Sequence, residues 1–343
     1  MNDTKINIKN YLGSSISIKG RTIKNRVFLA PMAGLGNIAF RELVDKFKGF
    51  GLLFTGMCSA KAIPHENPAI SPVFKWRKQE LPHLVCQIFG SDPITMARAA
   101  ERIEKENFFG VDLNFGCSVA AICKKGCGAE LLKNPVLASD IVKQVRNSVS
   151  IPVFVKFRTG WEDDPDFAVD MAKRFEDAGV DALVFHPRVA PDRRSRPPKW
   201  SHISRIKKAV SLPVFGNGNI FDLSDCAAMI EQTGCDGVSL GRIAVAKPWI
   251  AASSTEGFVV DNNIYYHTAM EMASLLLKHY DEHFAVKLFK KFVPYFSANF
   301  KFSHSICKKL LKENNMDKIQ DSIEIIFKDT PETLERPNLN IFI

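Results

Sequence analysis

The sequence lacks the usual features of exported and membrane-bound proteins. No run of 18 or more apolar residues occurs, which excludes a bilayer-spanning helix. The N-terminal segment has no apolar core of a secretory signal, and eight cysteines in 343 residues are too few for a disulfide scaffold. We therefore expect a cytoplasmic protein with reduced thiols and no membrane partner.

Several nucleotide- and metal-binding motifs are also missing. The glycine-rich fingerprint GxGxxG does not follow the first predicted strand, and no Gly-Lys pair precedes Ser or Thr. No CxxC pair occurs, and Cys117, Cys123 and Cys127 have no fourth ligand close by in the sequence. We therefore expect neither a P-loop nor a metal or iron–sulfur site.

Acidic residues are scarce in two segments of this basic chain. Overall, 46 Lys and Arg face 37 Asp and Glu, which gives a net charge of +9. Residues 188–208 contain eight basic residues and one acid, and residues 287–312 contain seven lysines and no acid. One such run is usually a solvated face, but two dense runs favour a polyanionic partner, and we expect RNA.

Eight short apolar runs, rich in Val, Phe and Leu, recur at spacings of 24 to 42 residues. They span residues 27–31, 51–57, 83–89, 110–116, 152–158, 182–187, 213–218 and 237–242. Amphipathic stretches lie between them, and those at 92–107, 134–149 and 164–179 begin with Asp or Asn followed by Pro, a helix-start signal. The pattern predicts an α/β fold, a (β/α)₈ TIM barrel, with an open doubly wound sheet as the alternative.

The pattern changes after Trp249. Residues 265–328 show no strand signal and carry helical spacing of apolar residues, which predicts a small helical bundle. Pro294 is expected to break or kink one of these helices, and residues 331–343 look like a tail. We therefore divide the chain into a barrel domain, residues 1–255, and a C-terminal all-helical domain, residues 256–343.

Polar and reactive residues cluster where the predicted strands end, which is where barrel enzymes carry their chemistry. They are Pro31, Met32, Gln87, Asn114, Cys117, Lys156, Arg158, His186, Arg188, Asn217, Gly218, Asn219, Gly241 and Arg242. The glycines after the last two strands suit a phosphate, with Arg242 supplying charge. Gln87, Lys156 and His186 suit the polar edges of a flat ring, so flavin mononucleotide (FMN) fits the set.

Cys117 differs from the other cysteines because it ends the fourth predicted strand and should face the mouth of the site. A free thiol is mostly protonated at neutral pH, so Cys117 can act as a proton donor.

These residues resemble the tRNA-dihydrouridine synthase family from about Val27 to Trp249. The matching segments are APMAG at 30–34, QIFG at 87–90, VDLNFGC at 111–117, GCGAELL at 126–132, VKFRTGW at 155–161, His186, NGNI at 217–220 and GR at 241–242. The helical C-terminal part is similar to the RNA-recognition bundle of that family.

The resemblance implies an FMN enzyme, driven by NADPH, that reduces the 5,6 double bond of uridine in folded RNA, most often tRNA. Hydride would pass from flavin N5 to C6, and Cys117 would give a proton to C5. Cofactor-binding residues would be Pro31, Met32, Ala33, Gln87, Lys156, His186, Asn217, Gly218, Asn219, Gly241 and Arg242. Asn114, Arg158 and Arg188 would bind the base, and the two basic runs would hold RNA phosphates. A monomer would suit access by a large RNA.

Three segments depart from the family pattern, and one of them is the loop at 190–200, which is rich in arginine where many members have a different loop. Ser118 stands where the family usually has proline, and His186-Pro187-Arg188-Val189 stands where it usually has His-Gly-Arg-Thr. These differences bear on the substrate more than on the chemistry, because Cys117 and Lys156 are retained. The same reaction on ribosomal RNA is therefore an alternative, as is a free-pyrimidine dehydrogenase of the dihydroorotate type. A catalytically silent RNA-binding protein is a third.

Overall fold

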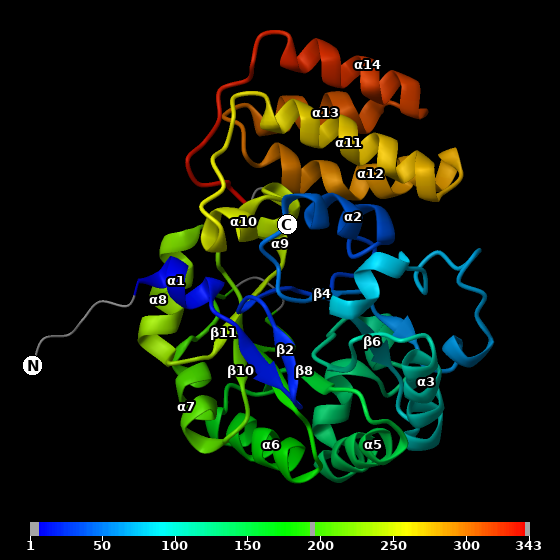
Figure 1. The fold of residues 1–343 in the computed structure, drawn as a ribbon, viewed down its shortest axis with the longest axis vertical. Coiled ribbons are helices and arrows are strands. Elements are labelled where there is room, and N and C mark those ends of the chain that lie inside the picture. The colour runs from blue at the N-terminus through cyan, green and yellow to red at the C-terminus, as the bar shows by residue number, and fades with distance from the viewer. Residues whose placement is uncertain (1–6, 193–195, 340–343) are drawn as a thin grey trace, which may run out of the picture.

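The computed structural model describes residues 7–192 and 196–339. Parallel strands form a barrel surrounded by helices, and four further helices stack against one flank of that barrel (Figure 1). Within the described ranges, no helix is long and apolar enough to cross a membrane.

The barrel strands follow one another in chain order around the ring. They are β3 (Val27–Leu29), β4 (Leu53–Phe54), β6 (Leu84–Phe89), β7 (Gly110–Phe115), β8 (Val153–Gly160), β9 (Ala182–Val189), β10 (Val214–Asn217) and β11 (Gly237–Leu240). Their order is β3-β11-β10-β9-β8-β7-β6-β4, and β5 (Cys58–Ser59) pairs separately with β6. A parallel bridge between Phe28 and Leu52 joins the two ends. The predicted eight-stranded barrel is confirmed.

Each predicted run holds a barrel strand, although β4 is much shorter than its run of seven residues. The ladder changes after Phe54 because the Gln87 N–H donates to the Thr55 hydroxyl, at 3.0 Å, in place of a backbone carbonyl.

Helices alternate with the strands as the sequence predicts. The longer ones are α2 (Ile38–Phe47), α3 (Pro93–Lys105), α5 (Pro135–Ser148), α6 (Pro165–Asp177), α7 (Ser201–Ala209) and α8 (Leu223–Thr233). The shorter ones are η1 (Ile63–His65), η2 (Lys78–His83), α4 (Ala120–Cys123), η3 (Gly128–Lys133), α9 (Arg242–Ala246) and α10 (Ile250–Thr255). The side chains of Asp92, Asn134 and Asp164 cap the helices α3, α5 and α6, which confirms the three predicted starts.

The amino end of the barrel is closed by side chains. Phe28, Phe54, Phe154 and Phe215 fill its interior there, and the Phe28 and Phe215 rings stack at 3.9 Å between centroids. A hairpin of β1 (Ile16–Ile18) and β2 (Arg21–Ile23), which follows α1 (Ile8–Gly13), packs Ile18 and Ile23 against this cluster. Because this end is plugged, a ligand can enter only from the carboxyl end.

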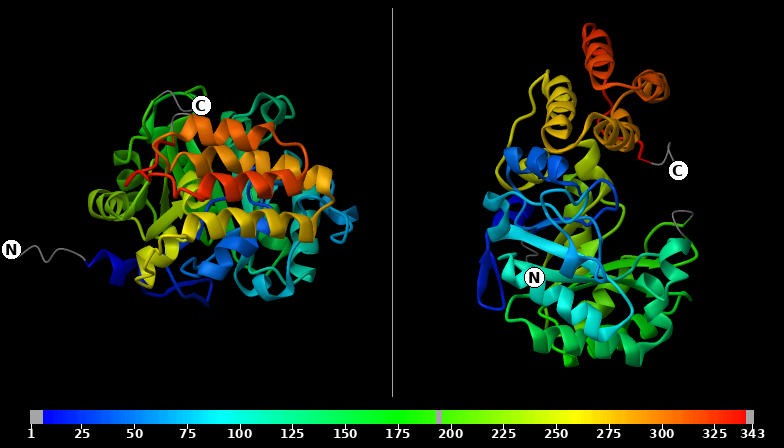
Figure 2. Two further views of the ribbon diagram at one scale, coloured as in Figure 1. Left: turned by 90° about the horizontal axis from the view of Figure 1, so that it is seen from above. Right: turned by 90° about the vertical axis from the view of Figure 1, so that its right-hand side faces the viewer.

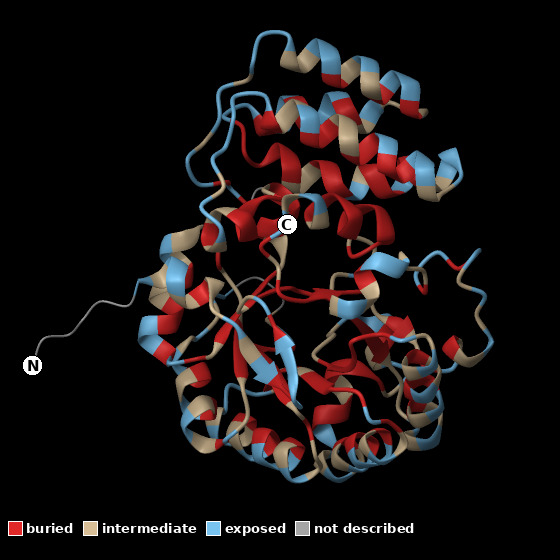
Figure 3. Cartoon of the chain, viewed as in Figure 1, coloured by how far each residue is buried: buried red, intermediate tan, exposed pale blue. Residues whose placement is uncertain are grey.

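The C-terminal helices are α11 (Ile264–His279), α12 (Glu282–Ser297), α13 (Ser303–Lys312) and α14 (Met316–Phe327). α11 packs on α2, and α12 packs on α9, so apolar residues of the bundle continue the barrel core (Figure 3). The predicted break at Pro294 is wrong, because α12 runs through this proline to Ser297.

The described part of the expected tail is anchored first to the helical bundle and then to the barrel. Thr333 bridges to Phe300, and the Arg336 guanidinium contacts Asp222 at 3.0 Å and Asp225 at 2.8 Å. The carbonyl of the buried Leu339 accepts a hydrogen bond from Arg242. The chain therefore returns to the carboxyl side of the barrel, opposite the hairpin at its plugged end (Figure 2).

Candidate active site

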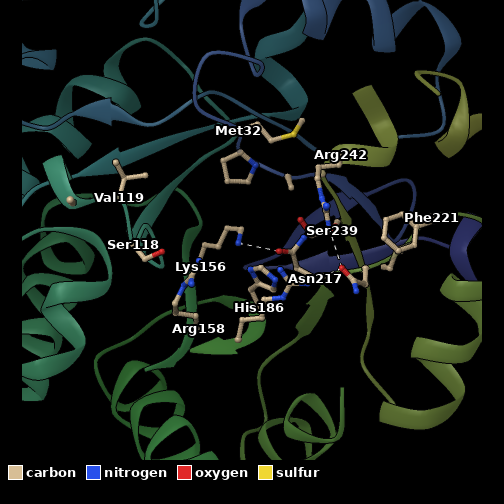
Figure 4. Close-up of a pocket in the computed structure, with 18 of the residues that line it drawn as sticks. Met32, Ser118, Val119, Lys156, Arg158, His186, Asn217, Phe221, Ser239 and Arg242 are labelled. Carbon is tan, nitrogen blue, oxygen red and sulfur yellow. Dashed lines mark hydrogen bonds between the residues drawn. The ribbon is translucent and has the colours of Figure 1, made fainter. Parts of the chain in front are cut away.

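A cavity of about 690 Å³ lies at the carboxyl ends of the barrel strands, a size typical of small-molecule sites. Most of the predicted site residues line this cavity, and they come from both early and late strands of the barrel (Figure 4). These lining residues are Pro31, Met32, Lys156, Arg158, His186, Arg188, Asn217, Gly218, Asn219, Gly241 and Arg242.

The described lining is strongly cationic. Lys156, Arg158, Arg188 and Arg242 contribute four basic groups, and no Asp or Glu is among the described lining residues. The Asn219 side-chain oxygen accepts from Arg188 Nη2 at 3.0 Å and from Arg242 Nη2 at 3.1 Å. One amide therefore holds two guanidinium groups, from β9 and α9, beside the same cavity, which suits an anionic ligand.

Lys156 and His186 form the floor between the arginines. The Lys156 ammonium donates to Asn217 Oδ1 at 3.3 Å, and Figure 4 shows the Lys156 and Asn217 side chains pointing toward each other. Burial, together with the Arg158 guanidinium, lowers the pKa of Lys156. Burial and the neighbouring cations, Lys156 foremost, lower the pKa of His186 well below its ordinary value. His186 is therefore a neutral imidazole at pH 7, able to donate and accept hydrogen bonds.

The turn after β10 requires glycine at position 218. Its φ of +120° is strained for other residues, and a Cβ there would lie 2.8 Å from the His186 ring. The Gly218 carbonyl accepts from the Trp200 indole at 3.0 Å, which fixes the turn against the loop after β9. The backbone at this turn can therefore approach a bound ligand closely.

Cys117 lies in a tight turn directly after β7. The Asn114 side-chain oxygen accepts the N–H groups of Gly116, at 3.1 Å, and Cys117, at 2.9 Å. The Cys117 carbonyl accepts the Ala129 N–H at 2.8 Å and contacts the Cys123 thiol at 3.5 Å. The turn is thus held from both sides, and the next residue, Ser118, lines the cavity.

Four predicted residues do not line the cavity. Cys117 is half-buried immediately before the lining segment, and Ala33 is exposed on the loop after β3. Gln87 and Asn114 are buried beneath the floor, with exposed fractions of 2% and 8%. The Asn114 amide is engaged by Gln87 and by the Cys117 turn, so it contacts the turn and not the cavity.

Sequence reasoning missed two kinds of site residue. Ser118, Val119 and Phe221 line the cavity from loops, which carry no periodic signal. Asp112 is fully buried beneath the floor, and burial raises its pKa above the ordinary value. Its position two residues before Asn114, on the same face of a strand, is the signal that could have found it.

The part of the chain that the structure describes holds no group of three or more His, Cys, Asp or Glu side chains placed for a metal ion. The cavity is instead lined by cationic side chains, a neutral imidazole, side-chain amides and backbone that a ligand can approach closely. This set suits a ligand that combines a phosphate with a flat, polar-edged ring.

The fold and the cation-lined cavity define an α/β-barrel protein with a ligand site at the carboxyl ends of its strands. The old yellow enzyme from Trypanosoma cruzi has the same fold, with a TM-score of 0.55 and 10% identity over 73% of this chain and 93% of that one. A 2-naphthoyl-CoA reductase complex superposes with a TM-score of 0.55 and 14% identity over 72% of this chain and 52% of that one.

The sequence model described as "Dihydrouridine synthase (Dus)" matches residues 28–328, and this chain belongs to the dihydrouridine synthase family. A probable tRNA-dihydrouridine synthase 1 of Synechocystis is 30% identical over 90% of this chain and 88% of its own. The tRNA-dihydrouridine synthase B of Pseudomonas aeruginosa is 32% identical over 83% of this chain and 87% of its own. The tRNA-dihydrouridine synthase B of Vibrio parahaemolyticus is 36% identical over 66% of this chain and 70% of its own. The resemblance found in the sequence is confirmed.

Proposed function

We propose that this protein reduces the 5,6 double bond of specific uridines in tRNA to dihydrouridine, with FMN as cofactor and NADPH as reductant. Family membership supports the reaction, and the names of the relatives support tRNA as substrate. The observation that carries the proposal is a cation-lined cavity, free of carboxylates among its described lining residues, directly beside the Cys117 turn.

The lining fits FMN. Arg242 and the backbone at Gly218 and Gly241 would hold the phosphate, and Lys156 would face the ring edge that becomes negative on reduction. Buried Arg158 Nε has no hydrogen-bond partner among the described residues, as expected for a group that awaits a ligand acceptor. When bound, FMN reduced by NADPH supplies the hydride for C6 of the uracil.

The protein's own groups would complete the reaction. The Cys117 thiol gives its proton to C5 and regains one from solvent, so that one hydride and one proton are added across the double bond. Arg158 and Arg188 would bind the carbonyl oxygens of a uracil drawn out of its RNA stack. We assign Asn114 to holding the Cys117 turn, because its amide is already engaged there.

The two basic runs differ in the structure. In residues 188–208, Arg196, Lys199, Arg205 and Lys207 each contact a carboxylate, and positions 193–195 lie outside the described residues. In residues 287–312, Lys301 contacts Glu332, and the other six lysines have no ion pair with a described carboxylate. We therefore propose residues 256–343 as the main RNA-recognition domain and residues 1–255 as the catalytic domain.

Lys291 links this basic face to the cavity. It belongs to α12, and its ammonium lies within 2.7 Å of the point where a Cβ on Gly34 would stand, above the loop after β3. An RNA held on α12 and α13 would therefore pass the loop that carries Pro31 and Met32, two of the lining residues.

Reversing the charge of Lys308 and Lys309, both exposed on α13, should weaken tRNA binding and flatten its salt dependence. The slope of log K against log salt falls by about 1 for each phosphate that the protein no longer neutralises. The matched control reverses Lys143 and Lys173, exposed on α5 and α6, and should bind normally. Filter binding at several salt concentrations measures both. An equal effect of the two pairs would show that α13 is not the RNA-binding face.

The proposed function is tested by position-resolved mapping of dihydrouridine in tRNA and rRNA from cells with and without the gene. Loss at defined tRNA positions is the expected result, and the purified protein should carry FMN and oxidise NADPH. Loss confined to rRNA would overturn the choice of substrate. No loss, with a yellow protein that oxidises NADPH, would overturn RNA reduction and direct the search to free pyrimidines.

A further inference from the structure

A chain of side-chain hydrogen bonds runs beneath the cavity floor from Asp112 to the Cys117 turn. Asp112 Oδ2 accepts from Gln87 Nε2 at 2.6 Å, and Gln87 Oε1 accepts from Asn114 Nδ2 at 2.9 Å. Asn114 Oδ1 then accepts the Cys117 N–H at 2.9 Å. Three side chains from two neighbouring strands, β6 and β7, therefore connect a buried carboxyl group to the turn.

The strand register places these groups together. Gln87 on β6 lies opposite Asp112 on β7, and Asn114 follows Asp112 by two residues, so the side chains of all three point into the barrel. Their exposed fractions are 8% or less, so water does not compete for these hydrogen bonds.

The donor and acceptor types at the two ends fix the direction of the chain. Backbone N–H groups only donate hydrogen bonds, so Asn114 must turn its oxygen toward the turn and its NH₂ group toward Gln87. Gln87 must then turn its oxygen toward Asn114 and its NH₂ group toward Asp112, whose Oδ2 accepts the hydrogen bond. Reversing either amide would set donor against donor or acceptor against acceptor.

The buried carboxyl group is unfavourable for stability in itself. Asp112 is fully buried, and its Oδ1 accepts no hydrogen bond from the described residues. An apolar residue of similar size would avoid this desolvation, so stability does not explain an aspartate here. Supplying an acceptor for the buried Gln87 NH₂ group, which completes the chain of hydrogen bonds to the turn, does explain it.

We propose that Asp112 is a positioning residue that, through Gln87 and Asn114, holds the Cys117 turn in the geometry needed for proton transfer. The proposal rests on the proposed role of Cys117 as the proton donor. It gives a function to a buried acid that contacts neither the cavity nor Cys117 directly.

The test compares Asp112→Leu, Asp112→Asn and the control Leu113→Val in the full-length, flavin-loaded protein. Leu113 is a fully buried residue of the same strand whose side chain points away from the barrel interior, so its variant perturbs β7 without touching the amide chain. Asp112→Leu should slow uridine reduction roughly 10- to 100-fold, through kcat more than KM, and should slow flavin reduction by NADPH much less, since Asp112 acts on Lys156 only through its charge. Asp112→Asn can still accept from Gln87 and should restore most of the rate.

A second readout does not depend on the proposed function. Alkylation of Cys117 by iodoacetamide, followed by mass spectrometry, should change severalfold in Asp112→Leu and stay unchanged in Leu113→Val. If the alkylation rate is unchanged in Asp112→Leu, the positioning role is overturned, whatever reaction the protein performs. Equal slowing of both half-reactions would also overturn it, because Asp112 would then act on the cofactor or on the fold.

Discussion

Replacing Cys117 with alanine is expected to slow uridine reduction about 10²- to 10⁴-fold while the protein keeps its flavin. The slower rate follows from removing the proposed donor of the C5 proton. Flavin binding should persist because Cys117 does not line the described cavity wall. Single-turnover oxidation of the reduced protein by tRNA measures the first effect, and visible absorbance measures the second. Release of flavin from the variant would contradict the assigned role.

Cys123→Ala is the matched control for this variant. Its thiol contacts the carbonyl oxygen of Cys117, at 3.5 Å, and is not among the described lining residues of the cavity. We expect turnover close to that of the unmodified protein. A comparable loss of turnover in both variants would indicate that the cysteines act on the turn as a pair, and that Cys117 is not the sole proton donor.

Replacing Glu80 with alanine is expected to lower the free energy of unfolding by about 3–5 kcal/mol. Glu80 and Arg41 form an ion pair at 2.8 Å, with both side chains fully buried, so the variant leaves the Arg41 guanidinium without its counter-charge. Arg77, which also contacts Glu80 at 3.0 Å, loses the same counter-charge and keeps only Asp45, at 3.2 Å. Urea denaturation followed by circular dichroism gives the change.

Asp170→Ala supplies the comparison for that stability measurement. Asp170 pairs with Arg174 at 2.6 Å on the surface of α6, where both side chains are exposed. Such a pair contributes roughly 0.3–0.5 kcal/mol, so the variant should be nearly as stable as the original. If Glu80→Ala were equally mild, the buried pair would have to be solvated in a way that the structure does not show.

The barrel can be predicted because its signals are local. Each strand is a short apolar run, and helix starts such as Asp92-Pro93 and Asp164-Pro165 carry their own capping side chains. The cavity lining follows from the same rule, since residues at the carboxyl ends of successive strands must meet. That is why Lys156, His186 and Arg242 can be identified from their positions in the sequence.

The features that escape prediction depend on contacts between distant segments. Arg205 and Lys207 look like a basic face until Asp166 and Asp236, from neighbouring helix–strand units, neutralise them. The C-terminal segment reads as a tail because its anchor at Arg336 depends on Asp222, 114 residues earlier. The periodic pattern of apolar residues in the sequence does not predict ion pairs between such distant segments.

The return of the chain to the barrel adds a second attachment of the chain to the packing of α11 on α2 and of α12 on α9. The bundle leaves the barrel through the loop after Thr255, and Arg336 and Leu339 fasten its other end to α8 and Arg242. A segment held at one end can swing about a hinge, whereas a segment held at both ends moves only if one attachment breaks. We therefore expect the lysines of α12 and α13 to stay at a fixed distance from the cavity. A bound RNA would then present one particular nucleotide to the cavity.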